Sequence, residues 1–212
     1  MNPPHTSMVY LVGADPALGE ALQALLQSVG LPTLTCPDVE AFLAVYQPDA
    51  PACLLLNAEM PGYNTLDIQQ RLREQDITTP VIIVAGRADV AMAVTALRQG
   101  ALDFIEKPFN EQLLLDGVHH ALVVDAARRR QRAQRENLRR RFNTLTAREQ
   151  DVLHWLVQGL SNREIAETLN LSRKTVEVHR AKVMRKMEAN TLSQLVRMAV
   201  AIGILKLYEA EA

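Results

Sequence analysis

The chain has 212 residues, of which 48% are hydrophobic and 22% charged, values ordinary for a globular protein of one or two domains. Its two cysteines, Cys36 and Cys53, are too few and too far apart for a disulfide framework or a metal cluster. No apolar run approaches the roughly 18 residues of a membrane span, and no basic-then-apolar leader opens the chain. We therefore expect a cytoplasmic protein without a membrane partner.

The formal net charge of −1 hides a division along the chain. Residues 1–124 carry 5 Lys+Arg against 14 Asp+Glu, net −9, whereas residues 125–212 carry 18 against 10, net +8. An acidic half joined to a basic half predicts two different roles, with the basic half facing a polyanion. A basic surface that is merely solvated is the alternative.

Five short apolar runs alternate with amphipathic segments in the first half of the chain. We expect strands at Met8–Gly13, Thr33–Cys36, Cys53–Asn57, Val81–Ala85 and Asp103–Ile105. Helical patterns fill 16–29, 38–46, 64–75 and 89–99, and another begins at Asn110, with Asp38 and Asn110 placed as N-caps. Strands separated by such helices predict a doubly wound, five-stranded parallel sheet over residues 1–122.

Residues 123–142 form a basic segment between the two halves. The stretch "AARRRQRAQRENLRRRF" holds eight arginines and neither glycine nor proline, so it should extend the preceding helix. It lacks the apolar seam of a coiled coil. We interpret it as an exposed helical linker, whose arginines either contact DNA phosphate or are simply solvated.

Residues 143–212 contain no strand pattern and predict a compact domain of four helices. Capping boxes, in which two side chains satisfy free amides of the first helical turn, stand at Thr146/Glu149, Ser161/Glu164 and Thr191/Gln194. Ser172 caps a further helix, separated from its predecessor only by "LNLS". Such a short break is typical of a helix-turn-helix unit.

The helix in "SRKTVEVHRAKVMRKM" (172–187) has two distinct faces when wound at 3.6 residues per turn. Val176, Val183 and Met187 point to one side, as core residues would. The opposite face combines cations with small or apolar residues, namely Lys174, Val178, Ala181, Lys182 and Arg185. The cations can bind DNA phosphates, and the small or apolar residues between them allow the helix to approach the base edges closely. Double-stranded DNA is therefore the expected partner.

The stretch "LTAREQDVLHWLVQGLSNREIAETLNLSRKTVEVHRAKVMRKM" resembles the DNA-binding domain of NarL/FixJ-type (LuxR-like) transcription regulators. The first half is similar to their receiver domain, through "EMPG", "DVAMAV" and "GALDFIEKPF", and is nearest to the FixJ branch. The resemblance implies base-reading positions at Glu177, Val178 and Ala181. It implies phosphate and sugar contacts at Lys174, Thr175, His179, Lys182 and Lys186, although His179 could equally be a packing residue.

The resemblance also implies a homodimer. The segment that begins at Phe104 corresponds to the family's receiver dimer face. The helix at 191–201 resembles the family's C-terminal dimerisation helix, with apolar residues at Leu192, Leu195, Val196, Ala199 and Val200. Packing of these side chains within their own domain is the competing interpretation.

The phosphorylation pocket implied by the resemblance is altered. Such receivers transfer a phosphoryl group to an aspartate with the help of Mg²⁺, two acidic residues, a hydroxyl and a lysine. This chain has Asn57 at the acceptor, Gly13 and Ala14 at the acid pair, and Ala85 at the hydroxyl position; only Lys107 remains. Asp15 or Glu59 could hold a cation nearby or be ordinary surface charges. The resemblance further implies a cis bond before Pro108.

These observations predict a DNA-binding transcription regulator that works without phosphorylation. Its receiver would serve dimerisation, or control by a protein or small-molecule regulator, and we expect neither a metal nor another cofactor. The alternative is an adaptor that sequesters a kinase or another regulator, against which the intact DNA-facing helix argues. We do not expect an enzyme, because the residues around Asn57 and Lys107 include no paired acid and base, no activated nucleophile and no phosphate-binding loop.

Overall fold

The structure is a computed structural model that describes residues 7–60, 62, 65–86 and 90–205. Its internal contacts divide the chain into two compact units, with the division between Arg129 and Arg130. Among the described residues, no helix is both long enough and apolar enough to cross a bilayer.

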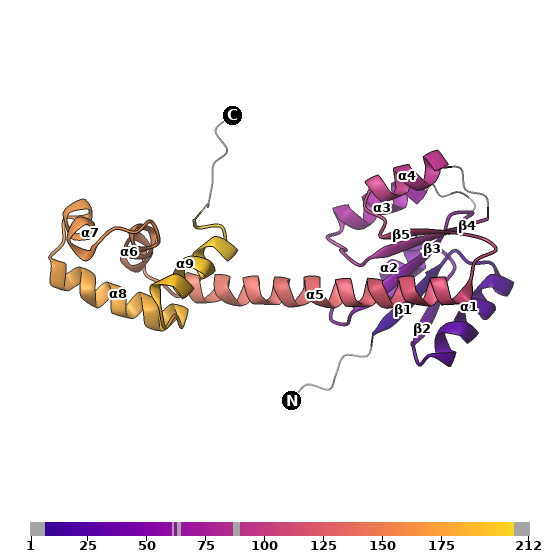
Figure 1. The fold of residues 1–212 in the computed structure, drawn as a ribbon, viewed down its shortest axis with the longest axis horizontal. Coiled ribbons are helices and arrows are strands. Elements are labelled where there is room, and N and C mark those ends of the chain that lie inside the picture. The colour runs from indigo at the N-terminus through magenta and orange to yellow at the C-terminus, as the bar shows by residue number, and fades with distance from the viewer. Residues whose placement is uncertain (1–6, 61, 63–64, 87–89, 206–212) are drawn as a thin grey trace. The chain divides into compact units, whose positions relative to one another are not determined.

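The first unit is built on a five-stranded sheet whose strands all run parallel (Figure 1). The strand order is β2-β1-β3-β4-β5. The strands are β1 (Met8–Val12), β2 (Thr33–Cys36), β3 (Ala52–Asn57), β4 (Val81–Ala85) and β5 (Asp103–Glu106). Every residue of β3 and β4 is buried, as expected for strands covered on both faces. Burial also raises the pKa of the Cys53 thiol, so this cysteine is an unreactive core residue.

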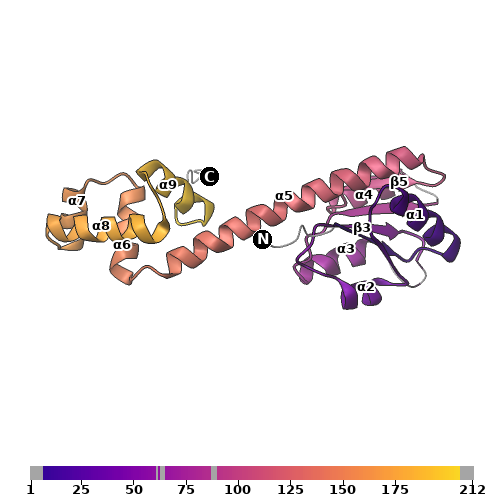
Figure 2. The same ribbon diagram turned by 90° about the horizontal axis from the view of Figure 1, so that it is seen from below.

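Helices cover both faces of this sheet, so the predicted doubly wound fold is confirmed. They are α1 (Pro16–Ser28), α2 (Val39–Val45), α3 (Thr65–Glu74), α4 (Val90–Arg98) and α5 (Glu111–Asn143). One core layer packs α2, α3 and α4 on the sheet, and the other packs α1 and the first turns of α5. Figure 2 shows α2 and α3 on the opposite side of the strands from α5. The predicted caps are present, since Asp38 accepts a hydrogen bond from Ala41 N and Asn110 accepts one from Gln112 N.

Helix α5 corrects the prediction of an exposed linker from residue 123. The helix is continuous, as predicted, but Asp125 is fully buried in the first unit. Arg128 and Arg129 also donate hydrogen bonds to backbone carbonyls of that unit. Arg139 and Arg141 likewise bond to carbonyls of the second unit. Both ends of the basic segment are therefore anchored.

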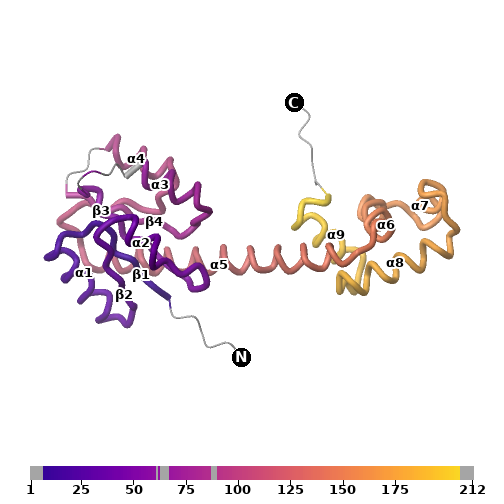
Figure 3. Tube along the Cα trace, turned by 180° about the vertical axis from the view of Figure 1, so that it is seen from behind, coloured from indigo at the N-terminus to yellow at the C-terminus, as the bar shows by residue number. Residues whose placement is uncertain are grey.

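In its described residues, the second unit contains the end of α5 and four further helices, which can be followed in Figure 3. They are α6 (Ala147–Val157), α7 (Asn162–Leu169), α8 (Arg173–Met187) and α9 (Leu192–Ala201). The capping boxes at Thr146 and Ser161 are complete, and Ser172 caps α8. The third predicted box is only half formed, because the Gln194 side chain accepts from Asn190 N instead of from the cap residue.

Candidate functional site

Three of the predicted pocket residues meet at the carboxyl-terminal edge of the sheet. Asn57 ends β3, Gly13 follows β1, and Lys107 follows β5. Because the strands are parallel, their carboxyl ends lie at one edge, where open α/β sheets place functional groups. Ala85 ends the neighbouring strand β4. The predicted cis bond between Lys107 and Pro108 is present.

Asn57 is bonded at both ends of its amide. Its Nδ2 atom donates to the Gly13 carbonyl at 2.8 Å, and its Oδ1 atom accepts from Lys107 Nζ at 3.0 Å. Lys107 Nζ also pairs with Glu59 Oε2 at 3.0 Å. The side chain of Asn57 is thus a neutral link between two strand ends, and the lysine is neutralised by Glu59.

Met60 and Glu59 fill the space around this link. A Cβ atom on Gly13 would lie 2.6 Å from Met60 Sδ, and Gly13 has a φ of +70°. A Cβ on Gly86 would lie 2.5 Å from Glu59 Oε1. A side chain at either glycine would therefore have to displace its neighbour, and at Gly13 it would also strain the backbone.

The residues at this edge do not fit a magnesium ion. Mg²⁺ requires hard oxygen ligands, usually carboxylates, in octahedral geometry, whereas Gly13 and Ala14 offer no side-chain oxygen. The Asp15 carboxylate caps α1 by accepting from Leu18 N at 3.0 Å, and Glu59 is paired with Lys107. The described residues contain no cluster of three or more His, Cys, Asp or Glu that could hold a metal ion.

The exposed face of α8 is the candidate nucleic-acid interface. Val176, Val183 and Met187 are fully buried, as the helical winding predicted. Six of the residues singled out for DNA lie exposed on the opposite side: Lys174, Glu177, Val178, Ala181, Lys182 and Arg185. The buried stripe anchors α8 on α6, α7 and α9, so this face is presented by a rigid element.

Lys186 is a correction to the predicted set. Its ammonium donates to Glu149 Oε2 at 2.6 Å and to the Thr144 carbonyl at 2.9 Å, so it serves its own domain instead of projecting towards phosphate. The hydrogen bond from Lys186, and then that from Thr146 N, holds the pKa of the Glu149 carboxyl below its ordinary value. This pair joins α8 to the cap of α6.

Thr175 and His179 lie half-buried at the edge of the exposed face. The Thr175 hydroxyl is hydrogen-bonded to the Ser172 hydroxyl at 2.7 Å. The Nδ1 atom of His179 is buried and has no hydrogen-bond partner in the part of the chain that the structure describes. Arg180, which the sequence reasoning did not single out, donates to Asn162 Oδ1 at 3.0 Å and so ties α8 to α7.

The predicted dimerisation helix α9 needs a second correction. Leu195 and Ala199 are fully buried in the core of their own domain, and Val196 packs against that core. Leu192 is 36% exposed, and Val196 and Val200 are half-buried, so these three predicted residues keep accessible surface. On the receiver-like unit, Phe104 is half-buried and packs on the core layer shared with α4. Helix α4 itself exposes large apolar side chains at Val90, Val94 and Leu97.

The sequence reasoning also missed the buried pair of Asp125 and Arg129. Asp125 Oδ2 accepts from Ala52 N at 2.8 Å and from Arg129 Nε at 2.5 Å. Arg129 in turn donates to the Pro48 carbonyl and to the Tyr46 hydroxyl. A signal was present, because Asp125 continues the apolar spacing of Leu114, Val118 and Ala121 on α5.

Comparison with known proteins matches both units. Residues 9–119 match the response regulator receiver domain, and residues 143–199 match the bacterial regulatory proteins of the luxR family. The chain is 38% identical over 201 residues to the transcriptional regulatory protein FixJ of Azorhizobium caulinodans, covering 95% of each chain. It is 37% identical over 198 residues to nodulation protein W of Bradyrhizobium diazoefficiens, covering 93% of this chain and 87% of that relative. Its structure is similar to that of the response regulator StyR, with a TM-score of 0.81, 34% identity, and coverage of 92% and 98% of the two chains.

Proposed function

The chain belongs to the luxR-family response regulators of the FixJ type, which are DNA-binding transcription regulators, and on this premise we propose that its receiver works without phosphorylation. The receiver then serves as an interaction domain, for dimerisation or for control by a protein or small ligand. The DNA-binding domain, residues 143–212, carries the output.

The hydrogen-bonded amide of Asn57 carries this proposal. An acyl phosphate forms only on a carboxylate, and an amide cannot supply one. Here the amide links Gly13 to Lys107, so the lysine that would contact a phosphoryl oxygen is already engaged. The side chain of Met60 fills the space in which an acidic residue at position 13 would lie. The replacements thus form one packed arrangement, which supports a pocket without phosphoryl chemistry.

For DNA we propose a division of roles across the exposed face of α8. Lys174, Lys182 and Arg185 contact phosphates, because their charges are exposed and point away from the core. Glu177, Val178 and Ala181 lie between these cations and face the bases. Thr175 and His179, at the edge of the face, are assigned to sugar and phosphate contacts.

We further propose that the protein binds DNA as a homodimer. Helix-turn-helix dimers read two half-sites, each with one helix in the major groove. The exposed apolar residues of α4, next to Phe104 on the receiver, and Leu192 on α9 are available for contact between two copies. These are separate surfaces on separate units, so each can be tested by itself.

Exposure to acetyl phosphate and Mg²⁺ tests the first proposal. Intact-mass spectrometry should show no phosphorylated protein, and affinity for a DNA site should not change. The variant Asn57→Asp should also remain largely unmodified, because Gly13 and Ala14 still provide no carboxylate for Mg²⁺. A receiver with the full set of acidic residues, treated in parallel, is the positive control. Stoichiometric, hydroxylamine-sensitive phosphate on the wild-type receiver would refute phosphorylation independence.

A further inference from the structure

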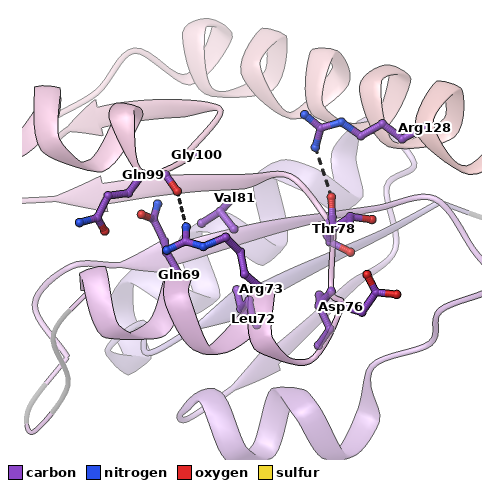
Figure 4. A pocket seen from close by; sticks show the side chains of 11 residues that line it. Gln69, Leu72, Arg73, Asp76, Thr78, Val81, Gln99, Gly100 and Arg128 are labelled. Atoms are coloured by element: carbon purple, nitrogen blue, oxygen red, sulfur yellow. Dashed lines mark hydrogen bonds between the residues drawn. The ribbon is translucent and has the colours of Figure 1, made fainter. Parts of the chain in front are cut away.

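A cavity of about 250 Å³ lies in the first unit at the edge of the sheet opposite Asn57 (Figure 4). It is formed by the last turns of α3, the segment 76–79 before β4, the Gln99–Gly100 turn before β5, and Arg128 on α5. Its position at the amino ends of β4 and β5 separates it from the altered phosphorylation pocket at their carboxyl ends. It belongs to the first unit, whereas the proposed DNA-facing helix α8 belongs to the second.

Two glutamine side chains that line the cavity have polar atoms without partners. Gln69 is only 3% exposed, and neither its Nε2 nor its Oε1 atom has a hydrogen-bond partner among the described residues. Gln99 Oε1 is also buried and also lacks a hydrogen-bond partner among the described residues. In the described part of the chain, five buried side-chain atoms lack a partner, and three of them belong to this cavity. Buried amides in proteins are otherwise hydrogen-bonded.

Two guanidinium groups also line the cavity, with Arg73 near the two amides and Arg128 beside Thr78. Arg73 donates to the Gln99 carbonyl, and Arg128 donates to the Thr78 carbonyl at 3.3 Å (Figure 4). Each guanidinium has five N–H donors, so one bond to a carbonyl leaves capacity for a further acceptor. With Asp76 also in the lining, the formal charge of the wall is one positive unit. Leu72, Ile77 and Val81 contribute apolar side chains to the lining.

We propose that this cavity binds a small organic monocarboxylate with an apolar body and a second polar group. A carboxylate matches the planar fork of a guanidinium, which binds it through two parallel hydrogen bonds. A single negative charge matches the single net positive charge of the wall, whereas a phosphate dianion would exceed it. The second polar group satisfies Gln69, whose amide both donates and accepts. A few convergent polar groups on an apolar wall are typical of small-molecule sites.

Binding at this site engages α5 through Arg128. The helix runs without interruption to Asn143, beyond the boundary of the first unit. A ligand held by Arg128 therefore contacts the helix that joins the receiver to the DNA-binding domain.

The test uses 4-hydroxybenzoate as the probe, because it combines a carboxylate, a flat apolar ring and a hydroxyl that can donate and accept. Two matched compounds each lack one group: benzoate lacks the hydroxyl, and 4-hydroxybenzyl alcohol lacks the charge. Binding to the full-length protein is followed by amide chemical shifts in NMR, which locate the site. We expect saturable shifts confined to the end of α3, residues 76–81 and Gln99–Gly100, with 4-hydroxybenzoate the tightest ligand.

Substitutions then assign the contacts. Arg73→Gln and Arg128→Gln should each weaken binding about tenfold or more, whereas Arg98→Gln, on an exposed position of α4 outside the cavity, should not. Gln69→Leu should abolish the preference for 4-hydroxybenzoate over benzoate without lowering the melting temperature, because it replaces an unpartnered amide with an apolar side chain of similar size.

Four results would overturn the proposal. Three concern binding: no saturable shifts at about 10 mM probe, shifts that none of the cavity substitutions alters, or equal binding of the uncharged alcohol. The fourth is a fall in melting temperature for Gln69→Leu, which would show that the amide serves the fold instead of a ligand. Each outcome is independent of whether the receiver can be phosphorylated and of whether the chain binds DNA.

Discussion

Replacing Arg129 with alanine should destabilise the first unit by about 3 kcal/mol, at the low end of the range for breaking a buried ion pair. The substitution leaves the Asp125 carboxylate, which has no solvent exposure, with only the Ala52 N–H as a partner. It also removes the hydrogen bonds from Arg129 to Pro48 and Tyr46. The unpaired charge, more than the lost bonds, sets the size of the effect.

The magnitude follows from the environment of the two charges. Removing one partner of a buried pair costs about 3–5 kcal/mol, whereas an exposed pair contributes about 0–1 kcal/mol. Arg129 retains 21% exposure of its side chain and Asp125 none, so partial solvent screening of the cation places the loss near the lower limit. Even this loss is a large fraction of the roughly 5–15 kcal/mol that stabilises a domain.

Urea denaturation of the full-length chain measures the effect. Far-ultraviolet circular dichroism follows both units, while the single tryptophan, Trp155, lies in α6 and reports on the second unit alone. The transition of the first unit should move to lower urea, and the fluorescence transition should not move. Arg71→Ala is the matched control, because it breaks an exposed ion pair with Glu40 in the same unit.

Combining Arg129→Met with Asp125→Leu should recover part of the lost stability, because an apolar pair removes the uncompensated charge. If Arg129→Ala costs no more than Arg71→Ala, the pair is not buried in solution, and the anchoring of α5 at this point is wrong.

Two substitutions on the DNA-facing side of α8 should have different effects. Lys182→Ala should weaken binding to all DNA sequences alike and make the dependence of log affinity on log salt concentration shallower by about 1. Glu177→Ala should instead change base preference, at a cost of about 1–3 kcal/mol on the preferred site. Footprinting at several salt concentrations separates them, and if neither variant alters affinity, slope or preference, the adaptor becomes the better description. The interactions that lower the pKa of Glu149 stabilise the second unit above about pH 4.5, the ordinary pKa of a glutamate. This stabilisation is lost as the pH falls through the pKa that Glu149 has in the folded protein. Glu149→Gln should therefore lower the melting temperature of the second unit at pH 7, followed by Trp155 fluorescence, and should reduce the fall of that temperature on acidification. If the melting temperature falls with pH as steeply as in the wild type, this carboxylate does not have the proposed role. Leu192→Glu should weaken binding to paired half-sites about tenfold but leave a single half-site unaffected in gel-shift titrations, and equal loss on both would show that α9 does not join two copies.

The amino-acid sequence by itself determined the features that depend on neighbouring residues. The strands, the caps at Asp38, Ser161 and Ser172, and the two faces of α8 were all predicted. Each rests on interactions within one or two turns or on the alternation of buried and exposed positions, so a short window contains the information. The motifs that indicate the family are likewise continuous stretches of the sequence, so they can be found without the tertiary structure.

Only the tertiary structure decided which partners cover the side chains. Helical periodicity shows the direction in which Leu195 points, but its partners in the domain core come from other helices, so periodicity could not separate that core from a dimer interface. Lys186 reads as a surface cation until α6 places Glu149 beside it.

The same limit applies to the altered pocket and to α5. Gly13 looks like a simple loss of an acidic residue, and only the packing of Met60 against it shows that the space has been filled. Asp125 belongs to an Arg-rich stretch that reads as solvated, yet β3 supplies a backbone N–H from 73 residues earlier in the chain. Contacts over such separations depend on how the sheet and helices assemble. Local propensity carries no information about that assembly, which is why the sequence alone left these roles open.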